Sequence, residues 1–150
     1  MAAARERPLS PHLTIWRWGP HMVVSILHRI TGAALSIVGL AIMVWWLMAI
    51  AGSPEAYASF THRVWGDLGD LNWNGLRAIA GSLAKIFLKL ALFGLTWAFF
   101  QHLFSGIRHL IMDSGMGFEL RANKAGAIAT IIGSLAATAL IWAYWLGAFE

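Results

Sequence analysis

Three long runs of apolar residues dominate the chain, and short polar segments separate them. The runs cover residues 22–51, 83–112 and 125–146, and the third contains no charged residue. About 20 apolar helical residues cross the hydrocarbon core of a bilayer, and a helix satisfies its backbone hydrogen bonds within its own segment. The pattern therefore predicts an all-α integral membrane protein with three transmembrane helices.

The polar segments 1–21, 52–82 and 113–124 indicate how the helices are oriented. Their shortness predicts one membrane-anchor domain over the 150 residues, and 1–21 lacks the apolar core of a secretory signal. Lys and Arg accumulate in loops on the inner side of a membrane. The basic residues of the two segments expected inside are Arg5, Arg7, Arg17, Arg121 and Lys124. Segment 52–82, with Arg63 and Arg77, is then expected outside, where it can hold a short surface helix.

The composition excludes a soluble enzyme and a disordered chain. Hydrophobic residues make up 59% of the sequence and charged residues only 12%, about half the charge that a soluble domain carries. Lipid or partner subunits must therefore cover the surface. The net charge of +4 comes from basic residues around the apolar runs, which indicates topology control rather than nucleic-acid binding. Cysteine is absent, so the chain supplies no thiolate to an iron–sulfur cluster.

His102 is the ionisable residue that lies deepest in an expected span. It lies ten residues before the end of the run 83–112, which is about 15 Å along a helix and close to the middle of the bilayer. An imidazole at that depth hydrogen-bonds within the bundle, relays protons or ligates a metal. Neutral imidazole is a common axial ligand of haem iron, and Gly106, one turn further along, leaves room for a flat macrocycle.

Polar residues also occur in one turn near the inner end of the first run. Ser25 and Arg29 are four residues apart and share a helix face, and His28 lies between them. A hydroxyl and a guanidinium at one place can hold a carbonyl or a carboxylate, although Arg29 can also be a topological anchor. In the third run, small residues recur every four positions and predict a packing seam: Ala125, Ala129, Gly133 and Ala137.

Two motifs resemble a known family. The first reads RPLSPHL at 7–13 and SILHRITG at 25–32, and the second reads HLFSGIRHLIMD at 102–113. In this order and on these helices, they resemble the cytochrome b membrane anchor of succinate dehydrogenase (respiratory complex II). The resemblance covers the whole chain.

The resemblance implies a set of partners. The chain would be half of a heterodimeric anchor bundle, completed by a second membrane-anchor protein. The two anchors would share one haem b and bind an iron–sulfur subunit and a flavoprotein subunit. The protein would be located in the bacterial inner membrane, with lipid around the helix bundle and the N-terminus in the cytoplasm. The chain would itself have no catalytic residue and no activity alone.

The resemblance also implies roles for individual residues. His102 stands at the position of the axial haem ligand, and the opposite ligand would come from the second anchor. His28 and Arg29 match neighbours of the haem propionates, and a haem held at His102 would also send its propionates toward Arg108. Ser25 and Arg29 match residues of the ubiquinone site. Its apolar wall would consist of Trp18, Met22 and Ile26.

Three other hypotheses remain open at this stage. The same scaffold can serve a fumarate reductase, in which electrons flow in the opposite direction. A haem-free transporter or assembly subunit can use His102 to relay protons. Finally, His28 and His102 can both ligate one haem, which we disfavour because His28 is expected well toward the membrane boundary.

Overall fold

The computed structural model describes residues 11–66 and 71–147, and within these ranges the secondary structure is entirely helical. Arg5, Arg7 and the first four residues of the RPLSPHL segment, 7–10, lie outside the described residues. In chain order the helices are α1 (His12–Ile15), α2 (Pro20–Ala34), the π-helical turn η1 (Leu35–Gly39), α3 (Leu40–Ala51), α4 (Pro54–Trp65), α5 (Leu76–Asp113) and α6 (Leu120–Trp145).

Three continuous helical stretches are long and apolar enough to cross a membrane: Pro20–Ala51, Leu76–Asp113 and Leu120–Trp145. This confirms the prediction of an all-α integral membrane protein with three transmembrane helices. The first stretch joins α2, η1 and α3 end to end. It begins where local chemistry favours a helix start, because Gly19 is extended and Pro20 occupies the first helical position.

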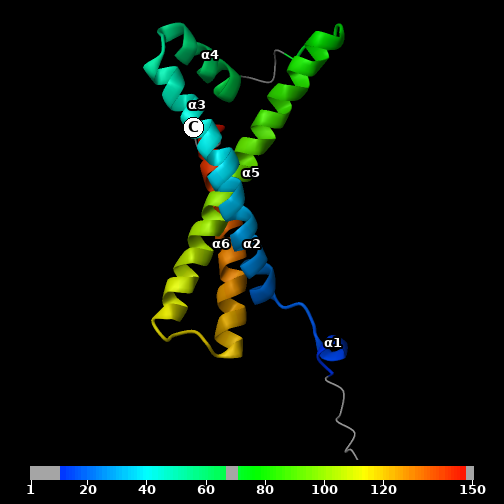
Figure 1. Cartoon of the computed structure of the whole chain (residues 1–150), viewed down its shortest axis with the longest axis vertical. Helices are drawn as coiled ribbons and strands as arrows, with labels where there is room; N and C mark the ends of the chain where they lie inside the picture. Colours follow the sequence, from blue (N-terminus) through cyan, green and yellow to red (C-terminus); the bar gives the residue numbers. More distant parts are fainter. Residues whose placement is uncertain (1–10, 67–70, 148–150) are drawn as a thin grey trace, which may run out of the picture.

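The molecule narrows where the long helices cross and opens at both ends (Figure 1). In one half, α2, α5 and α6 pack side by side. In the other half, α3 and α4 diverge from the first part of α5. Helix α4 confirms the expected surface helix in the 52–82 connection. Phe60 and Val64 of α4 are buried against α3 beside Ala49 and Trp45, so this helix turns its apolar side back onto the chain.

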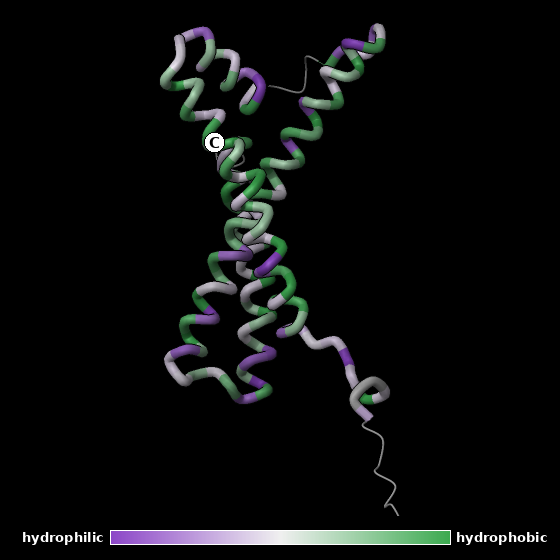
Figure 2. Tube along the Cα trace, viewed as in Figure 1, coloured by the Kyte–Doolittle hydropathy of each residue, from purple (hydrophilic) through white to green (hydrophobic). Residues whose placement is uncertain are grey.

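The packed half has a polar interior and an apolar exterior. Figure 2 shows hydrophobic residues along the three long helices and hydrophilic residues near the α5–α6 turn. Large apolar side chains point outward, such as Ile30 at 58% exposure and Leu110 at 69%. The buried polar side chains of the packed half are Thr31, Gln101, Ser105, Arg108, Thr130, Ser134 and Thr138. In lipid, apolar surface does not drive helices together, so small and polar residues occupy the helix contacts.

The packing face of α6 differs from the expected seam. Ala125 and Ala129 are exposed. The buried residues of α6 are Ala127, Thr130, Ser134 and Thr138. Gly133 and Ala137 are half-buried, and a Cβ atom at Gly133 would lie 3.3 Å from the Phe104 ring of α5. The repeat of Ala and Gly therefore marked the contact with α5 only in its second half, because hydroxyl side chains, which can bond to their own helix backbone, fill the rest of the contact.

Candidate functional site

Three histidine rings meet where α2 passes α5. The rings of His28 and His102 are stacked, with centroids 4.0 Å apart and planes 7° apart. The ring of His109 meets His28 edge-on, with centroids 5.2 Å apart. The structure thus brings together two residues that the sequence analysis singled out separately.

His28 lies at nearly the depth of His102, not well toward the membrane boundary as expected. The two helices run in opposite directions (Figure 1). His28 lies eight residues after the start of α2 at Pro20, and His102 lies eleven residues before the end of α5 at Asp113. At a rise of 1.5 Å per residue the two depths differ by only about 5 Å. The expectation failed because it took the start of the first helix as Met22 and did not allow for how the two helices pass each other.

The hydrogen bonds of His102 determine which ring nitrogen carries the proton. Its Nδ1 lies 3.1 Å from the backbone oxygen of His28. A carbonyl oxygen only accepts, so Nδ1–H is the donor and Nε2 is the ring nitrogen that this contact leaves unused. Thr31 Oγ1 lies 3.4 Å from the same Nδ1, and Nε2 has no hydrogen-bond partner among the described residues. His102 is therefore held through Nδ1, with Nε2 directed away from these two contacts.

Gly32 completes the seat of the His102 ring. A Cβ atom at Gly32 would lie 2.9 Å from Cε1 of His102 and 3.3 Å from its Nδ1. Any side chain at this position would push the ring out of its place. The ring is thus confined between the α2 backbone at Gly32 and the stacked ring of His28.

Ser105 orients His28 in the same way, and the sequence analysis missed it. Its Oγ lies 2.7 Å from His28 Nδ1 and 2.7 Å from the carbonyl oxygen of Gln101. The hydroxyl has one proton, which it donates to that carbonyl, so Ser105 Oγ accepts a hydrogen bond from His28 Nδ1–H. The signal in the sequence was a hydroxyl three residues after His102, which alone does not show what it binds.

The residues expected around ubiquinone form an open surface at the start of α2. Trp18 is 60% exposed and Ile26 42% exposed, and Arg29 is exposed as well. Ser25 and Met22 are half-buried. A closed quinone pocket at this place would need walls from other chains.

Arg108 lies across the contact between α5 and α6. Its side chain is buried, and its Nη2 donates a hydrogen bond to Asn123 Oδ1. A Cβ atom at Gly126 would lie 3.6 Å from its Nε, which places the guanidinium against the backbone of α6. Asn123 is a second residue that the sequence analysis missed, because one amide in a polar turn carries no distinguishing signal.

A buried polar pair lies beside the histidines on the α6 side of α5. Ser134 Oγ donates to Gln101 Oε1 over 2.8 Å, and Gln101 is fully buried. Its Nε2 is buried without a hydrogen-bond partner among the described residues. An unpaired buried amide lowers the stability of the fold. The protein bears this loss unless another group binds Gln101 Nε2.

Comparison with known proteins places the chain in a family. The family model of the succinate dehydrogenase/fumarate reductase transmembrane subunit matches residues 3–141. The succinate dehydrogenase cytochrome b556 subunit of Paracoccus denitrificans is 35% identical over 130 residues, covering 87% of this chain and 85% of that protein. The same subunit of Rickettsia typhi is 35% identical over 138 residues, covering 91% of each chain.

A mitochondrial protein is similar to this chain as well. The mitochondrial succinate dehydrogenase cytochrome b560 subunit of Sus scrofa is 30% identical over 136 residues, covering 90% of this chain and 70% of that protein. The family model covers both motifs of the sequence analysis, the first two membrane helices and the third as far as residue 141. The chain therefore belongs to the family of succinate dehydrogenase/fumarate reductase transmembrane subunits, and these relatives are succinate dehydrogenase cytochrome b subunits.

Proposed function

We propose that the chain is the cytochrome b anchor of a succinate:ubiquinone oxidoreductase in a bacterial inner membrane. It would supply one haem b ligand and part of the ubiquinone site. It would also dock the iron–sulfur and flavoprotein subunits on the side of its N-terminus. Its bacterial relatives carry the name succinate dehydrogenase cytochrome b556 subunit, which favours this direction over a fumarate reductase. The observation that carries the proposal is the position of His102 inside a membrane helix, held through Nδ1 with Nε2 unpaired among the described residues.

The residues around His102 fit a haem. A histidine that binds a metal normally donates its other ring N–H to a carbonyl or carboxylate, and His102 Nδ1 donates to His28 O. A Cβ atom built at Gly106 would have His28 Cε1, 3.9 Å away, as its one neighbour within 4 Å among the described residues. The backbone of α5 is thus open to a flat group one turn from His102. When bound, haem b supplies a one-electron redox centre.

The stacked rings argue against two haem ligands from this chain. Imidazole nitrogens bind metals at about 2.0–2.1 Å, and axial ligands of one iron approach from opposite faces of the macrocycle. Parallel rings with centroids 4.0 Å apart leave no space for a macrocycle between them. The other ligand would therefore come from a second membrane-anchor protein.

Three cationic or polar side chains would face the haem propionates. Arg29 is exposed and has all five guanidinium N–H groups available for a carboxylate. Arg108 uses one N–H for Asn123 and keeps others. His28 is held by Ser105 through Nδ1, so its other ring nitrogen, Nε2, would be the atom that faces a propionate.

Ubiquinone would bind at the start of α2. The Ser25 hydroxyl and the Arg29 guanidinium would donate hydrogen bonds to a quinone oxygen and stabilise negative charge that develops there. Trp18, Met22 and Ile26 would contact the apolar ring and tail. Because these residues form an open surface, the other subunits would complete the pocket and exclude water.

Replacement of His102 tests the haem assignment. We expect His102→Ala to abolish the reduced haem b absorbance of the purified complex, because the variant lacks the nitrogen that would bind iron. His62→Ala, in α4, is the control and should keep the spectrum. A normal haem spectrum in His102→Ala would contradict the proposal.

Replacement of Ser25 tests the quinone assignment. A hydrogen bond to a charged group contributes about 1.5–3 kcal/mol, so Ser25→Ala should slow ubiquinone reduction by about ten- to a hundredfold if the bond forms mainly in the transition state. Succinate oxidation with an artificial acceptor that takes electrons upstream should stay normal. Full ubiquinone reduction with unchanged inhibitor sensitivity would place the pocket elsewhere.

A further inference from the structure

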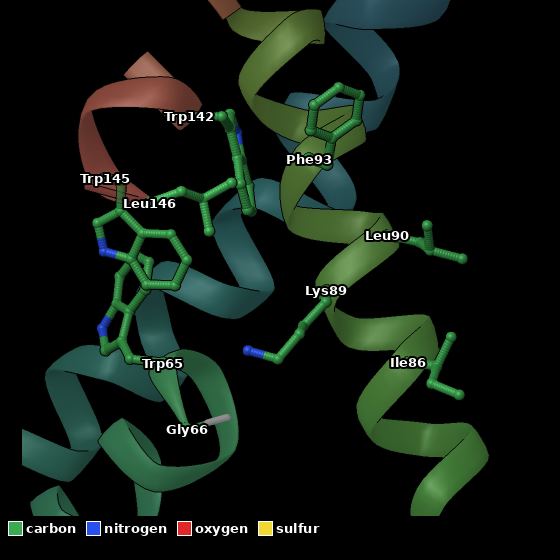
Figure 3. A pocket seen from close by; sticks show the side chains of 9 residues that line it. All are labelled: Trp65, Gly66, Ile86, Lys89, Leu90, Phe93, Trp142, Trp145 and Leu146. Atoms are coloured by element: carbon green, nitrogen blue, oxygen red, sulfur yellow. The ribbon is translucent and has the colours of Figure 1, made fainter. Parts of the chain in front are cut away.

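A cavity of about 500 Å³ lies at the end of the bundle remote from the histidines. It is an open recess lined by the end of α4, the end of α6 and the middle of α5 (Figure 3). The side chain of Lys89 extends from α5 into the space in front of Trp65 and Trp145. Lys89 is thirteen residues from His102, or about 20 Å along α5, so this cavity is separate from the proposed haem site.

One wall of the cavity is a continuous row of aromatic rings. Trp65 and Trp145 have centroids 5.4 Å apart, Trp145 and Trp142 5.5 Å, and Trp142 and Phe93 5.4 Å. Tryptophan is enriched where membrane helices meet the headgroup layer, and α6 ends at Trp145. The cavity therefore lies at the level of lipid headgroups.

Among the described residues, Lys89 is the single charged residue that lines this cavity. Its Nζ lies 3.5 Å from the backbone oxygen of Val64, a long contact with one of the carbonyls that end α4. An ammonium group has three N–H donors, so it keeps the capacity to bind an anion. The aromatic wall lowers access of water to that charge.

The lining continues from the cation onto lipid-facing surface. Leu90 is 65% exposed and Phe93 48% exposed on the same side of α5. A ligand that suits this arrangement has an anionic head for Lys89 and an apolar chain for Leu90 and Phe93. We propose that the cavity binds an anionic phospholipid, whose phosphodiester group contacts Lys89 and whose acyl chain lies along α5.

The test uses the intact membrane complex that contains this chain, in nanodiscs of phosphatidylcholine with a minor fraction of phosphatidylglycerol. Native mass spectrometry would count the phosphatidylglycerol molecules that stay bound. We expect one tightly held molecule in the parent complex. Lys89→Gln should weaken its retention by about ten- to a hundredfold, as the loss of a charged hydrogen bond predicts.

Lys85→Gln is the matched control, because Lys85 lies one turn earlier on α5 and lines a different recess with Arg63. It removes the same charge and should keep the bound lipid. Equal losses in the two variants would indicate only general attraction to the anionic surface and would overturn the proposal. Unchanged retention in Lys89→Gln would overturn it as well.

Two further arms keep the test decisive if Lys89→Gln impairs assembly. Lys89→Arg should retain the lipid, and Trp142→Leu, which keeps the charge but opens the aromatic wall, should weaken retention. An excess of inorganic phosphate should leave the phosphatidylglycerol bound, because the acyl chain contributes to binding. Displacement by inorganic phosphate, or full retention in Trp142→Leu, would refute a lipid site.

Discussion

Gly32→Ala is the most direct test of how His102 is seated. The new Cβ would lie 2.9 Å from His102 Cε1, whereas ordinary contacts begin at 3.4 Å. The difference, 3.4 − 2.9 Å, requires the ring to retreat by about 0.5 Å. The ring cannot do so freely, because Nδ1 is bonded to His28 O and one face is stacked on the ring of His28.

We expect Gly32→Ala to change the free energy of unfolding only slightly but to lower haem affinity clearly. Loss of the Nδ1 hydrogen bond costs about 0.5–1.5 kcal/mol, and loss of the ring stacking costs a similar amount. Alanine in place of glycine stabilises a helix by about 1 kcal/mol. The net change in the free energy of unfolding is therefore small, from about zero to 2 kcal/mol. Haem affinity should fall by about 10–100-fold, the usual effect of disturbing a group that orients a metal ligand.

The assay compares haem content and reduced absorbance per complex during titration with haem. Gly94→Ala is the control, since a Cβ atom at Gly94 of α5 would have nothing within 4 Å. It should keep normal haem binding. If Gly32→Ala binds haem with the parent affinity and spectrum, the reasoning is refuted, because His102 would then not depend on the seat described.

Two further predictions concern buried polar groups. Gln101→Leu removes an amide nitrogen that is buried without a partner among the described residues. Ser134 Oγ loses Gln101 Oε1 but keeps its hydrogen bond to Ile131 O, so the melting temperature should stay equal or rise. A loss of stability above about 2 kcal/mol would show that another group binds Nε2. Asn123→Ala removes the hydrogen-bond partner of buried Arg108 and should destabilise the protein by about 1.5–3 kcal/mol. Asn123→Asp should be at least as stable as the parent in thermal denaturation. Equal stability of all three proteins would contradict the reasoning.

The sequence by itself determined the membrane architecture and the family. A helix in lipid must satisfy its backbone within its own segment, so three uninterrupted apolar runs specify three spanning helices without reference to any neighbour. The motifs at 25–32 and 102–113 likewise carried the resemblance that the comparisons confirm. The depth of His102 followed from the length of one helix alone.

Contacts between helices were decided only by the tertiary structure. The level of His28, the partner of its Nδ1 and the proton position on His102 depend on atoms more than 70 residues apart in the chain. So does the face of α6, where Thr130, Ser134 and Thr138 are buried rather than Ala125 and Ala129. In a soluble protein an apolar stripe would have marked these faces. In lipid the outward faces of the helices are apolar as well, and helices associate through small and polar side chains. Hydrophobic periodicity therefore does not show how each helix is rotated about its axis. Only the packed helices show which hydroxyls, amides and imidazoles meet.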